Sequence, residues 1–423
     1  MNDVVVVGAG VAGLSAAAAL RRAGVAVTLL EAGSRSGGRA YTEHPAALGG
    51  TAFDHGASWL HAAERNKLAD LARANGDALT DSGGTWVRRV FVGNRPATAA
   101  ELLSYDAAWE RYSQVATARA ALDPDISLAE AVAELRGDPW TATVETWEAA
   151  LIAAADPQKF SARDWQLNEL HGSNLGVPGG LGALVARRLA PLAGPVRLAT
   201  KVTRIDWGRA GGGVAVTTPT GTLTARACIV TVSTGVLASG GIEFAPALPA
   251  AQQAAIAGLP MGLLSKVALH LPHPERLGLP AGASLHLQVP APGVPTMFFL
   301  LRPDHVIGFV GGPAAWELSR AGPAAAEAFA REQFTALTGA ALGAAVVTGW
   351  GADPTQLGAY AYATPGHTDA RAAMDAPLGG GLIFAGEAWC LDGLAGTVGG
   401  AFLSGERAAA LAVGLLRPAA APG

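Results

Sequence analysis

The N-terminal segment limits the folds open to this chain more than any other stretch. Residues 4–7 (VVVV) form an apolar, β-branched run that is typical of a buried parallel strand. A glycine-rich turn, GAGVAG, spans residues 8–13 and leads into the helix-forming residues 14–22. A second apolar run at residues 25–30 ends at Glu31. This order, with the acid about 20 residues after the glycines, is the dinucleotide-binding fingerprint and predicts a Rossmann-like α/β domain.

Each residue of this fingerprint has its own physical role. Gly8 allows the tight turn, Gly10 lets the backbone approach a pyrophosphate, and Gly13 lets the helix pack closely against the strand. Glu31 would accept hydrogen bonds from the ribose hydroxyls of an adenosine. The fingerprint does not distinguish NAD from FAD. Arg39, in the glycine-rich segment that follows, is placed either against a phosphate, over a flavin, or on the surface of a loop.

A stretch near the C-terminus offers a second candidate ligand site. Residues 382–385 (LIFA) are a short apolar run typical of a buried strand, and Gly386 and Glu387 follow directly. Residues 396–400 (GTVGG) open a predicted helix that continues through 401–416. A helix start exposes unpaired N–H groups and a partial positive charge, which suit a partly anionic ligand such as a reduced flavin. Taken alone, the stretch is equally a strand–loop–helix unit without a ligand.

Composition excludes several classes of protein. The chain has 423 residues, half of them hydrophobic, which predicts about two to three domains. A net charge of −4 without a long charge run argues against nucleic acid and anionic membrane partners. Glycine or proline interrupts every long apolar run, so we expect no membrane span. Cys228 and Cys390 lie far apart in sequence, which favours a reducing, cytoplasmic location over a disulfide framework.

Separate blocks of sequence carry a resemblance that spans nearly the whole chain. The start contains GAGVAGLSAA and VTLLEAGSRSGGR, residues 53–61 read FDHGASWLH, and the end contains FAGEAWC and GTVGGAFLSGERAA. In this order the blocks resemble the flavin-containing amine oxidase family, which includes monoamine, polyamine and L-amino-acid oxidases and flavin histone demethylases. The resemblance is greatest to polyamine-oxidase-type members.

The resemblance implies a fold with two discontinuous domains. Residues 1–75, 185–245 and 376–423 would form an α/β, Rossmann-like FAD-binding domain. Residues 76–184 and 246–375 would form an α+β substrate-binding domain with an antiparallel sheet as its floor and a helical cap. The residues themselves predict short antiparallel strands at 284–289, 297–301 and 306–311 and a single strand at 196–205.

Lys266 is unusual in a chain with so few lysines. Strand alternation places it on one face with Ala268 and His270, opposite Val267 and Leu269. An ammonium on a mainly apolar strand is costly unless it is paired or hydrated. One interpretation is an edge lysine that discourages aggregation. The resemblance instead implies that Lys266 hydrogen-bonds a water next to flavin N5.

The block WGADPTQLGAY, which begins at Trp350, matches a further pattern of the family. The resemblance places Tyr360 against the flavin as an aromatic wall. Monoamine oxidases carry a flavin-linking cysteine just before this tyrosine, whereas this chain has Ala359, so we expect non-covalent FAD. The opposite wall would fall at Thr397, with Trp389 filling the gap.

The resemblance yields a full set of expected site residues. The expected catalytic residues are Lys266, Tyr360, Trp389 and Thr397. The expected cofactor contacts are Gly8, Gly10, Ala12, Gly13, Glu31, Ala32, Gly38, Arg39, Gly56, Ala57, Ser58, Trp59, Val202, Trp350, Gly386, Glu387, Thr397 and Val398. The expected substrate contacts are His61, Glu169, His171, Tyr360 and Trp389. Glu169 and His171 are also compatible with a solvated loop, Trp140, Trp147 and Trp165 are interpreted as core aromatics, and no metal site is expected.

The expected chemistry follows from these residues. An amine α-carbon donates a hydride only when its nitrogen is neutral, and an aromatic cavity would disfavour the ammonium form while attracting the cation inward. The flavin would take the hydride, the imine would hydrolyse, and O2 would reoxidise the flavin to give H2O2. The expected partners are therefore a small-molecule amine, foremost a polyamine, and O2. The alternatives are an L-amino-acid oxidase, a flavin desaturase or protoporphyrinogen-type oxidase, and a non-enzymatic flavin-binding scaffold.

Overall fold

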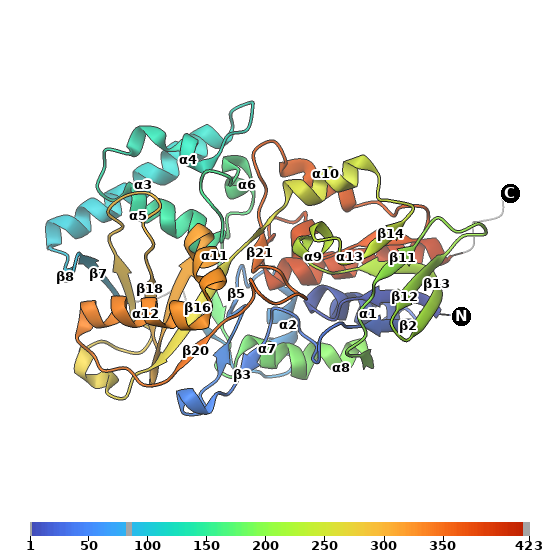
Figure 1. The fold of residues 1–423 in the computed structure, drawn as a ribbon, viewed down its shortest axis with the longest axis horizontal. Coiled ribbons are helices and arrows are strands. Elements are labelled where there is room, and N and C mark those ends of the chain that lie inside the picture. Colours follow the sequence, from blue (N-terminus) through green and yellow to red (C-terminus); the bar gives the residue numbers. More distant parts are fainter. Residues whose placement is uncertain (1, 82–86, 418–423) are drawn as a thin grey trace.

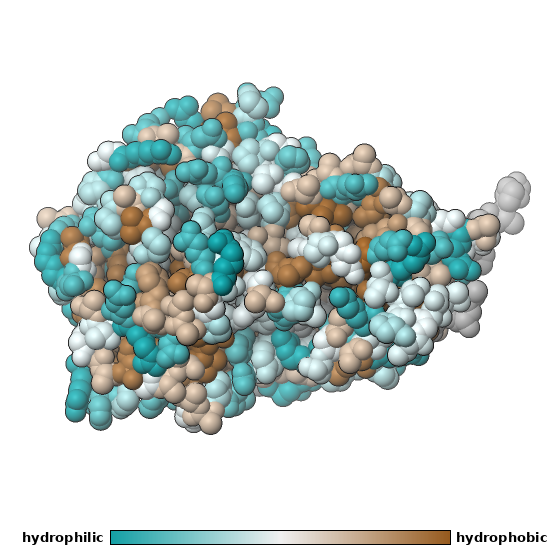
Figure 2. Space-filling view, in the orientation of Figure 1, coloured by the Kyte–Doolittle hydropathy of each residue, from teal (hydrophilic) through white to brown (hydrophobic). Residues whose placement is uncertain are grey.

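The computed structural model describes residues 2–81 and 87–417. Figure 1 shows an elongated molecule with a lobe at each end, and both chain termini lie at the same end. In the face shown in Figure 2, hydrophilic and apolar side chains are intermixed over both lobes. None of the helices in the described residues is long and apolar enough to cross a lipid bilayer.

An eight-stranded sheet forms the lobe that holds both termini. Its parallel part consists of β10 (Val196–Arg197), β2 (Val27–Leu30), β1 (Asn2–Val7), β13 (Gly221–Val230) and β22 (Leu382–Phe384). Its remaining strands are β12 (Val214–Thr218), β11 (Arg204–Asp206) and β14 (Glu243–Ala245). The predicted strand–turn–helix–strand unit is present as β1, α1 (Val11–Arg22) and β2, and the Rossmann-like architecture is confirmed.

The first and last long helices pack against each other on this sheet. In α1, the Ser15 hydroxyl donates a hydrogen bond of 2.9 Å to the carbonyl of Phe402 in α13 (Val398–Leu416). A Cβ atom on Gly405 would lie 2.2 Å from the carbonyl oxygen of Ala12, so this approach requires glycine. The two ends of the chain therefore meet beside the glycine turn.

The predicted strand at residues 196–205 is wrong, because the segment forms two short strands. After β10, Ala199 has φ of 49°, in the left-handed region, and the chain turns there. The amide of Thr200 donates to the carbonyl of Glu31 at 2.7 Å, which holds the turn against the end of β2. β11 then pairs with β14 and β12 rather than with β2. The break carries Val202 to the carboxyl edge of the parallel strands.

The second lobe is built on a seven-stranded sheet. In spatial order its strands are β20 (Ala345–Val347), β16 (Leu264–His270), β19 (His305–Gly311), β18 (Phe298–Leu301), β17 (Ser284–Leu287), β7 (Arg88–Val92) and β8 (Arg95–Pro96). The predicted antiparallel strands pair as expected, from β16 through β17. Strand β16 has a neighbour on each side, so Lys266 is not on an edge strand.

Helices enclose this sheet and form the cap (Figure 1). Helices α11 (Gly312–Ala321) and α12 (Pro323–Thr338) pack on one face, where Phe334 contacts Phe299. The cap consists of α3 (Ala99–Ala120), α4 (Leu128–Ala131), a 3₁₀ turn (Ala133–Leu135), α5 (Thr141–Glu145), a π-helix (Thr146–Ile152) and α6 (Ala162–Leu167). Trp140 is 1% exposed and packs on Tyr105, as expected of a core aromatic.

The remaining elements are short, and several of the helices among them pack in the lobe that holds both termini. The strands are β3 (Thr42–Glu43), β4 (Phe53–Asp54), β5 (Trp59–Leu60), β6 (Thr80–Asp81), β9 (Leu175–Gly176), β15 (Met261–Gly262) and β21 (Tyr360–Ala361). The helices are α2 (Lys67–Ala74), α7 (Leu181–Leu184) with a π-helix (Val185–Leu189) and α8 (Ala190–Ala193), α9 (Thr234–Ala238) and α10 (Ala250–Gly258). The 3₁₀ turns are Ala46–Leu48, Pro274–Leu277, Thr368–Met374 and Glu387–Trp389.

Candidate active site

A cavity of about 760 Å³ runs from the glycine turn of the first lobe to the cap of the second. At one end it is lined by Gly8, Gly10 and Glu31, and at the other by Trp147 and Trp165. The N-termini of α1 and α13 both contribute to its lining. Because each helix N-terminus offers unpaired N–H groups and a partial positive charge, the cavity has two positions suited to anionic parts of a ligand.

The glycine turn has the conformation and the crowding that the fingerprint requires. Gly8 has φ of +99°, and a Cβ atom there would lie 2.6 Å from the Thr231 hydroxyl. A Cβ atom on Gly13 would lie 1.9 Å from the carbonyl oxygen of Gly8, so Gly13 serves the packing of α1. The Glu31 carboxylate accepts hydrogen bonds from the amides of Ala9 (2.8 Å) and Gly33 (2.7 Å). A carboxylate has about four acceptor positions, so Glu31 retains capacity for ribose hydroxyls.

The structure brings nearly all the expected cofactor residues to this one cavity. The lining includes Gly8, Gly10, Ala12, Glu31, Ala32, Gly38, Arg39, Gly56, Ala57, Ser58, Trp59, Val202, Trp350, Gly386, Glu387, Thr397 and Val398. The cradle and the two helix ends fit a flavin dinucleotide. Within residues 2–81 and 87–417, no group of three or more His, Cys, Asp or Glu side chains could hold a metal ion.

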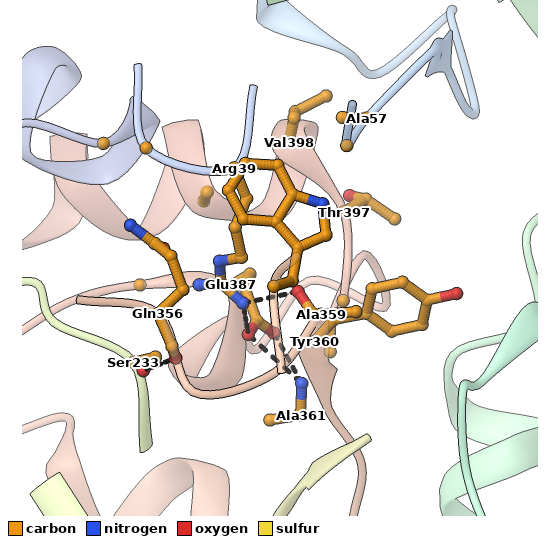
Figure 3. Close-up of a pocket in the computed structure, with 18 of the residues that line it drawn as sticks. Arg39, Ala57, Ser233, Gln356, Ala359, Tyr360, Ala361, Glu387, Thr397 and Val398 are labelled. Atoms are coloured by element: carbon orange, nitrogen blue, oxygen red, sulfur yellow. Dashed lines mark hydrogen bonds and ion pairs between the residues drawn. The ribbon is translucent and has the colours of Figure 1, made fainter. Parts of the chain in front are cut away.

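Arg39 and Glu387 tie three distant segments together at the middle of the cavity (Figure 3). The Arg39 guanidinium donates to Glu387 Oε1 at 3.0 Å and to the carbonyl of Ala359 at 2.7 Å. Glu387 Oε1 also accepts the amide of Ala361 at 3.2 Å. Arg39 is therefore not a loop-surface residue, and it fixes the strand that carries Tyr360.

Lys266 is buried, with 4% of its surface exposed, and is fully hydrogen-bonded. Its ammonium donates to the carbonyls of Asp54 (2.9 Å) and Gly56 (2.5 Å) and to the hydroxyl of Ser58 (2.7 Å). It lies 6.0 Å from the ring centroid of Trp59. Burial lowers the pKa of the Lys266 ammonium to about 8, and the negative charge of Asp54 partly opposes this shift. Lys266 thus fastens the substrate-lobe sheet to the FDHGASWLH loop at the cavity.

Tyr360 and Thr397 are held in the cavity wall by their hydroxyl groups. The Tyr360 hydroxyl donates to the carbonyl of Leu151 in the π-helix at 2.9 Å, and burial raises the pKa of this phenol above its usual range. The Thr397 hydroxyl accepts the amide of Gly400 at 3.0 Å and donates to the carbonyl of Leu394 at 2.8 Å. Thr397 therefore caps α13, and its hydroxyl is already occupied by the protein.

Three of the expected site residues, Gly13, Trp389 and His171, do not lie in the cavity wall, and Gly13 instead serves the packing of α1. Trp389 is 5% exposed and packs in the core with Phe384 and Met374, because the 3₁₀ turn that presents Glu387 to the cavity directs Trp389 beneath it. The His171 side chain is 76% exposed and lies 3.6 Å from Glu169, so its interpretation as part of a solvated loop is the correct one. Glu169 does line the cavity, with its side chain 47% exposed.

The cap contributes cavity residues that sequence reasoning missed or misassigned. Trp147 and Trp165, interpreted as core aromatics, line the cavity, and Trp165, which is 8% exposed, is also part of the core of the cap as expected. Further lining residues were not singled out from the sequence: Trp109, Tyr112, Glu148 and Phe160. The expected His61 also lines it, and its Nδ1 lies 2.8 Å from Asn174 Oδ1. Burial lowers the pKa of His61. The tryptophan-rich composition of the cap was the available signal, but it does not tell which face of a helix meets a cavity.

The fold and the cavity together fit a flavoprotein oxidoreductase whose substrate would bind beside the cofactor. The chain belongs to the family described as flavin containing amine oxidoreductase, whose model matches residues 11–413. It is a flavin-dependent amine oxidoreductase, and its cofactor is FAD.

Individual proteins resemble the chain over nearly its full length. Polyamine oxidase 2 of Arabidopsis thaliana is 31% identical, over 96% of this chain and 87% of that protein. The structure of a cyclohexylamine oxidase from Brevibacterium oxydans IH-35A aligns with a TM-score of 0.79 at 24% identity, covering 98% of this chain and all of that one. A putrescine oxidase redesigned in its cofactor binding aligns with a TM-score of 0.80 at 20% identity, covering 97% and 99% of the two chains.

Proposed function

We propose that this protein oxidises a polyamine or another primary or secondary amine, with O2 as the electron acceptor and H2O2 as the second product. The observation that carries this proposal is the continuity of one cavity from the dinucleotide turn to a chamber walled by aromatic rings. The relatives named as polyamine, putrescine and cyclohexylamine oxidases support amines as the substrate class.

FAD, when bound, supplies the hydride acceptor and the reaction with O2. The residues of the chain would bind it at Gly8–Gly13, Glu31 and the N-terminus of α13. Trp59, Trp350 and Tyr360 would exclude water around the substrate nitrogen, which lowers the pKa of an ammonium and favours the neutral amine. The hydrogen bond from Tyr360 to Leu151 fixes the ring, so the wall is preorganised before substrate arrives.

We propose that Lys266 supplies a fixed positive charge beside the reacting centre. Its three hydrogen bonds hold the ammonium at the loop that contains Gly56, Ser58 and Trp59. A water held next to flavin N5, as the resemblance implies, would have to replace one of these acceptors. In either arrangement the charge would favour the transfer of electrons to O2.

The position of Ala359, directly before Tyr360, supports non-covalent binding of FAD. An alanine methyl group has no atom that could form a thioether with the flavin. Acid denaturation followed by filtration should therefore separate all of the yellow flavin from the protein. Flavin that remains with the polypeptide would contradict this.

The state of the cavity arginines argues against an L-amino-acid oxidase. Such an enzyme would need an arginine that clamps the substrate carboxylate. Among the described residues the arginines that line the cavity are Arg39, which is paired with Glu387, and Arg371, which is paired with Asp164. Both charges are already neutralised by the protein.

Anaerobic mixing of the yellow protein with spermidine, with a monoamine and with an L-amino acid tests the proposal. We expect bleaching of the flavin by amines and none by the L-amino acid. Bleaching by the amino acid alone would favour the rival oxidase, and bleaching by none would favour a desaturase or a scaffold. A colourless protein that cannot be reconstituted with FAD would overturn the proposal altogether.

A further inference from the structure

The carboxylates that line the cavity differ in how many hydrogen bonds and ion pairs they already make with the protein. In the described residues they are Glu31, Glu148, Asp164, Glu169 and Glu387. Glu31 accepts two backbone amides and Glu387 pairs with Arg39. Asp164 binds Arg371 through both oxygens and also accepts the amide of Ala363. Three of the five are therefore engaged in structural contacts, which leaves Glu148 and Glu169.

Glu148 lies inside the chamber without a cationic partner among the described residues. One carboxylate oxygen, Oε2, accepts the indole N–H of Trp165 at 2.8 Å, which is a neutral donor. Burial raises the pKa of Glu148, the hydrogen bond from Trp165 opposes the shift, and the charge of Glu169 adds to it. Glu148 is half-buried, and a carboxylate that has lost part of its surrounding water is stabilised when a cation joins it. The neighbouring aromatic rings of Trp147 and Trp165 suit the same cation through cation–π attraction.

A second polar group at this end of the chamber is also unsatisfied. Tyr112, on α3, lines the cavity and is 1% exposed, and its hydroxyl has no hydrogen-bond partner among the described residues. Burial raises the pKa of this phenol, and the nearby charges of Glu145 and Glu148 raise it further. Buried hydroxyl groups without a partner are rare in proteins. An unpaired hydroxyl near an incompletely paired carboxylate indicates that a ligand completes this polar cluster.

The π-helix links this cluster to the reacting end of the chamber. Glu148 and Leu151 belong to the same π-helix, and the carbonyl of Leu151 accepts the hydrogen bond from Tyr360. Insertions of this kind often occur at functional sites, because they redirect side chains that a regular α-helix would place elsewhere. One short element thus holds the hydroxyl of Tyr360 and also carries the carboxylate of Glu148 in the wall of the same cavity.

We propose that Glu148 binds a second cationic group of the substrate, so that the site selects diamines and longer polyamines over monoamines. This inference rests on the proposed function and names the residue and the substrate class of the same site. The neutral nitrogen to be oxidised lies near Tyr360, and the remote ammonium lies against Glu148 and the cap aromatics. Glu169, nearer to solvent, adds a second negative charge along the path of a cation that enters.

Putrescine and n-butylamine test the inference, because they share one carbon chain and differ in the second amino group. Each is mixed anaerobically, over a range of concentrations, with the FAD-loaded wild type, and the dependence of the initial rate of flavin bleaching on amine concentration gives its half-saturating concentration. We expect half-saturation by putrescine, or by spermidine, at a concentration at least about tenfold below that for butylamine, since a hydrogen bond to a charged group is worth about ten- to hundredfold in binding. Equal values for diamines and monoamine would overturn the inference.

Glu148→Gln removes the charge and keeps the shape of the side chain. We expect it to raise the half-saturating concentration of putrescine about ten- to hundredfold. The half-saturating concentration of butylamine should change by less than about twofold. Glu145→Gln, at a neighbouring buried acid that does not line the cavity, is the matched control and should keep the preference. Retention of the preference by E148Q would also overturn the inference.

Two further outcomes keep the experiment decisive. If E148Q fails to retain FAD, Tyr112→Phe is measured instead, and we expect a loss of about two- to fivefold confined to the diamine. An unchanged preference in that variant counts against the cluster. If neither amine bleaches the wild-type flavin, the proposed amine oxidation is refuted. If both amines bleach it with equal half-saturating concentrations, only the proposed role of Glu148 is refuted.

Discussion

At the scale of single residues, Lys266 is fixed by the loop that it reaches. Its stem lies on a strand of the substrate sheet, and its ammonium is bound to Asp54, Gly56 and Ser58 in a segment some two hundred positions earlier in the chain. A side chain with three acceptors and little exposure is held in one position. Its charge is therefore preorganised, which is the condition under which electrostatic assistance to a reaction is large.

Lys266→Met keeps the length of the side chain and removes its charge. We expect the variant to bind FAD, but its reduced flavin to react with O2 on the order of 10²-fold more slowly. Stopped-flow mixing of reduced protein with O2 measures this rate. Lys159→Met, at a side chain that is 69% exposed, is the control and should match the wild type. An unchanged rate in K266M would remove Lys266 from the oxygen step.

The lowered pKa of Lys266 predicts a pH dependence of the same step. Because burial lowers this pKa to about 8, the ammonium loses its proton as the pH rises through about 8. The charged form assists, so the rate of reoxidation should fall across this range in the wild type and should not do so in K266M. The folded-state pKa lies below the ordinary value of 10.5, so this group favours folding more as the pH rises from about 8 to 10.5. A wild-type rate that rises or stays level through this range would contradict the assignment.

At the scale of elements, the contact between α1 and α13 aligns the two helix ends that face the cavity. The helices approach closely because Gly405 has no side chain to separate them. Both N-termini then line one cavity, the first by way of Gly10 and the second by way of Thr397. The spacing of these two elements therefore sets the shape of the cofactor site.

Two glycines of α13 provide a matched pair of variants. A Cβ atom on Gly405 would lie 2.1 Å from the Ser15 hydroxyl, whereas one on Gly414 would meet nothing within 4 Å. We expect Gly405→Ala to lower the free energy of unfolding by about 1–3 kcal/mol and to weaken FAD retention. Gly414→Ala should be neutral or stabilising by up to about 1 kcal/mol. Thermal unfolding with flavin fluorescence checks both, and equal melting temperatures would refute the role of this contact.

Local patterns predicted much of the fold, because their determinants lie close together in sequence. The run from Gly8 to Glu31 and the strands around Lys266 depend on periodicity and glycine placement. The break at Ala199 was not predictable in this way, because it is held by a hydrogen bond from Thr200 to Glu31 in another element.

The site was predicted only in part, because some of its residues lie in local sequence patterns and others are positioned by packing between distant segments. The cofactor residues belong to glycine-rich blocks whose chemistry is visible in the sequence. The face that a tryptophan presents is set by packing, so Trp389 was wrongly assigned to the cavity and Trp147 to the core. The π-helix that presents Glu148 has no periodic signature in the residues themselves.

At the scale of the whole molecule, a buried ion pair connects the cap to the FAD lobe. Asp164 on α6 binds Arg371 through both oxygens, and Arg371 also donates to the carbonyl of Ala388 at 2.7 Å. The two side chains are 4% and 7% exposed. This pair holds the cap over the segment that presents Glu387 to the cavity.

Breaking this buried pair should lower the free energy of unfolding much more than breaking an exposed pair. Arg371→Met leaves the Asp164 carboxylate buried and unpaired, and we expect a loss of about 3–5 kcal/mol in the free energy of unfolding. Arg119→Met breaks a pair whose side chains are 47% and 53% exposed, and should cost less than about 1 kcal/mol. Denaturant unfolding of the holoprotein compares them. Similar losses in both variants would refute a structural role for the buried pair.

The packing of the last helix on the first has a consequence for how the protein matures. A ribosome translates the glycine turn almost four hundred codons before the opposite side of the same pocket. Throughout that interval the nascent chain carries a half-built nucleotide cradle. Stable loading of the prosthetic group therefore has to wait until α13 has left the exit tunnel and docked.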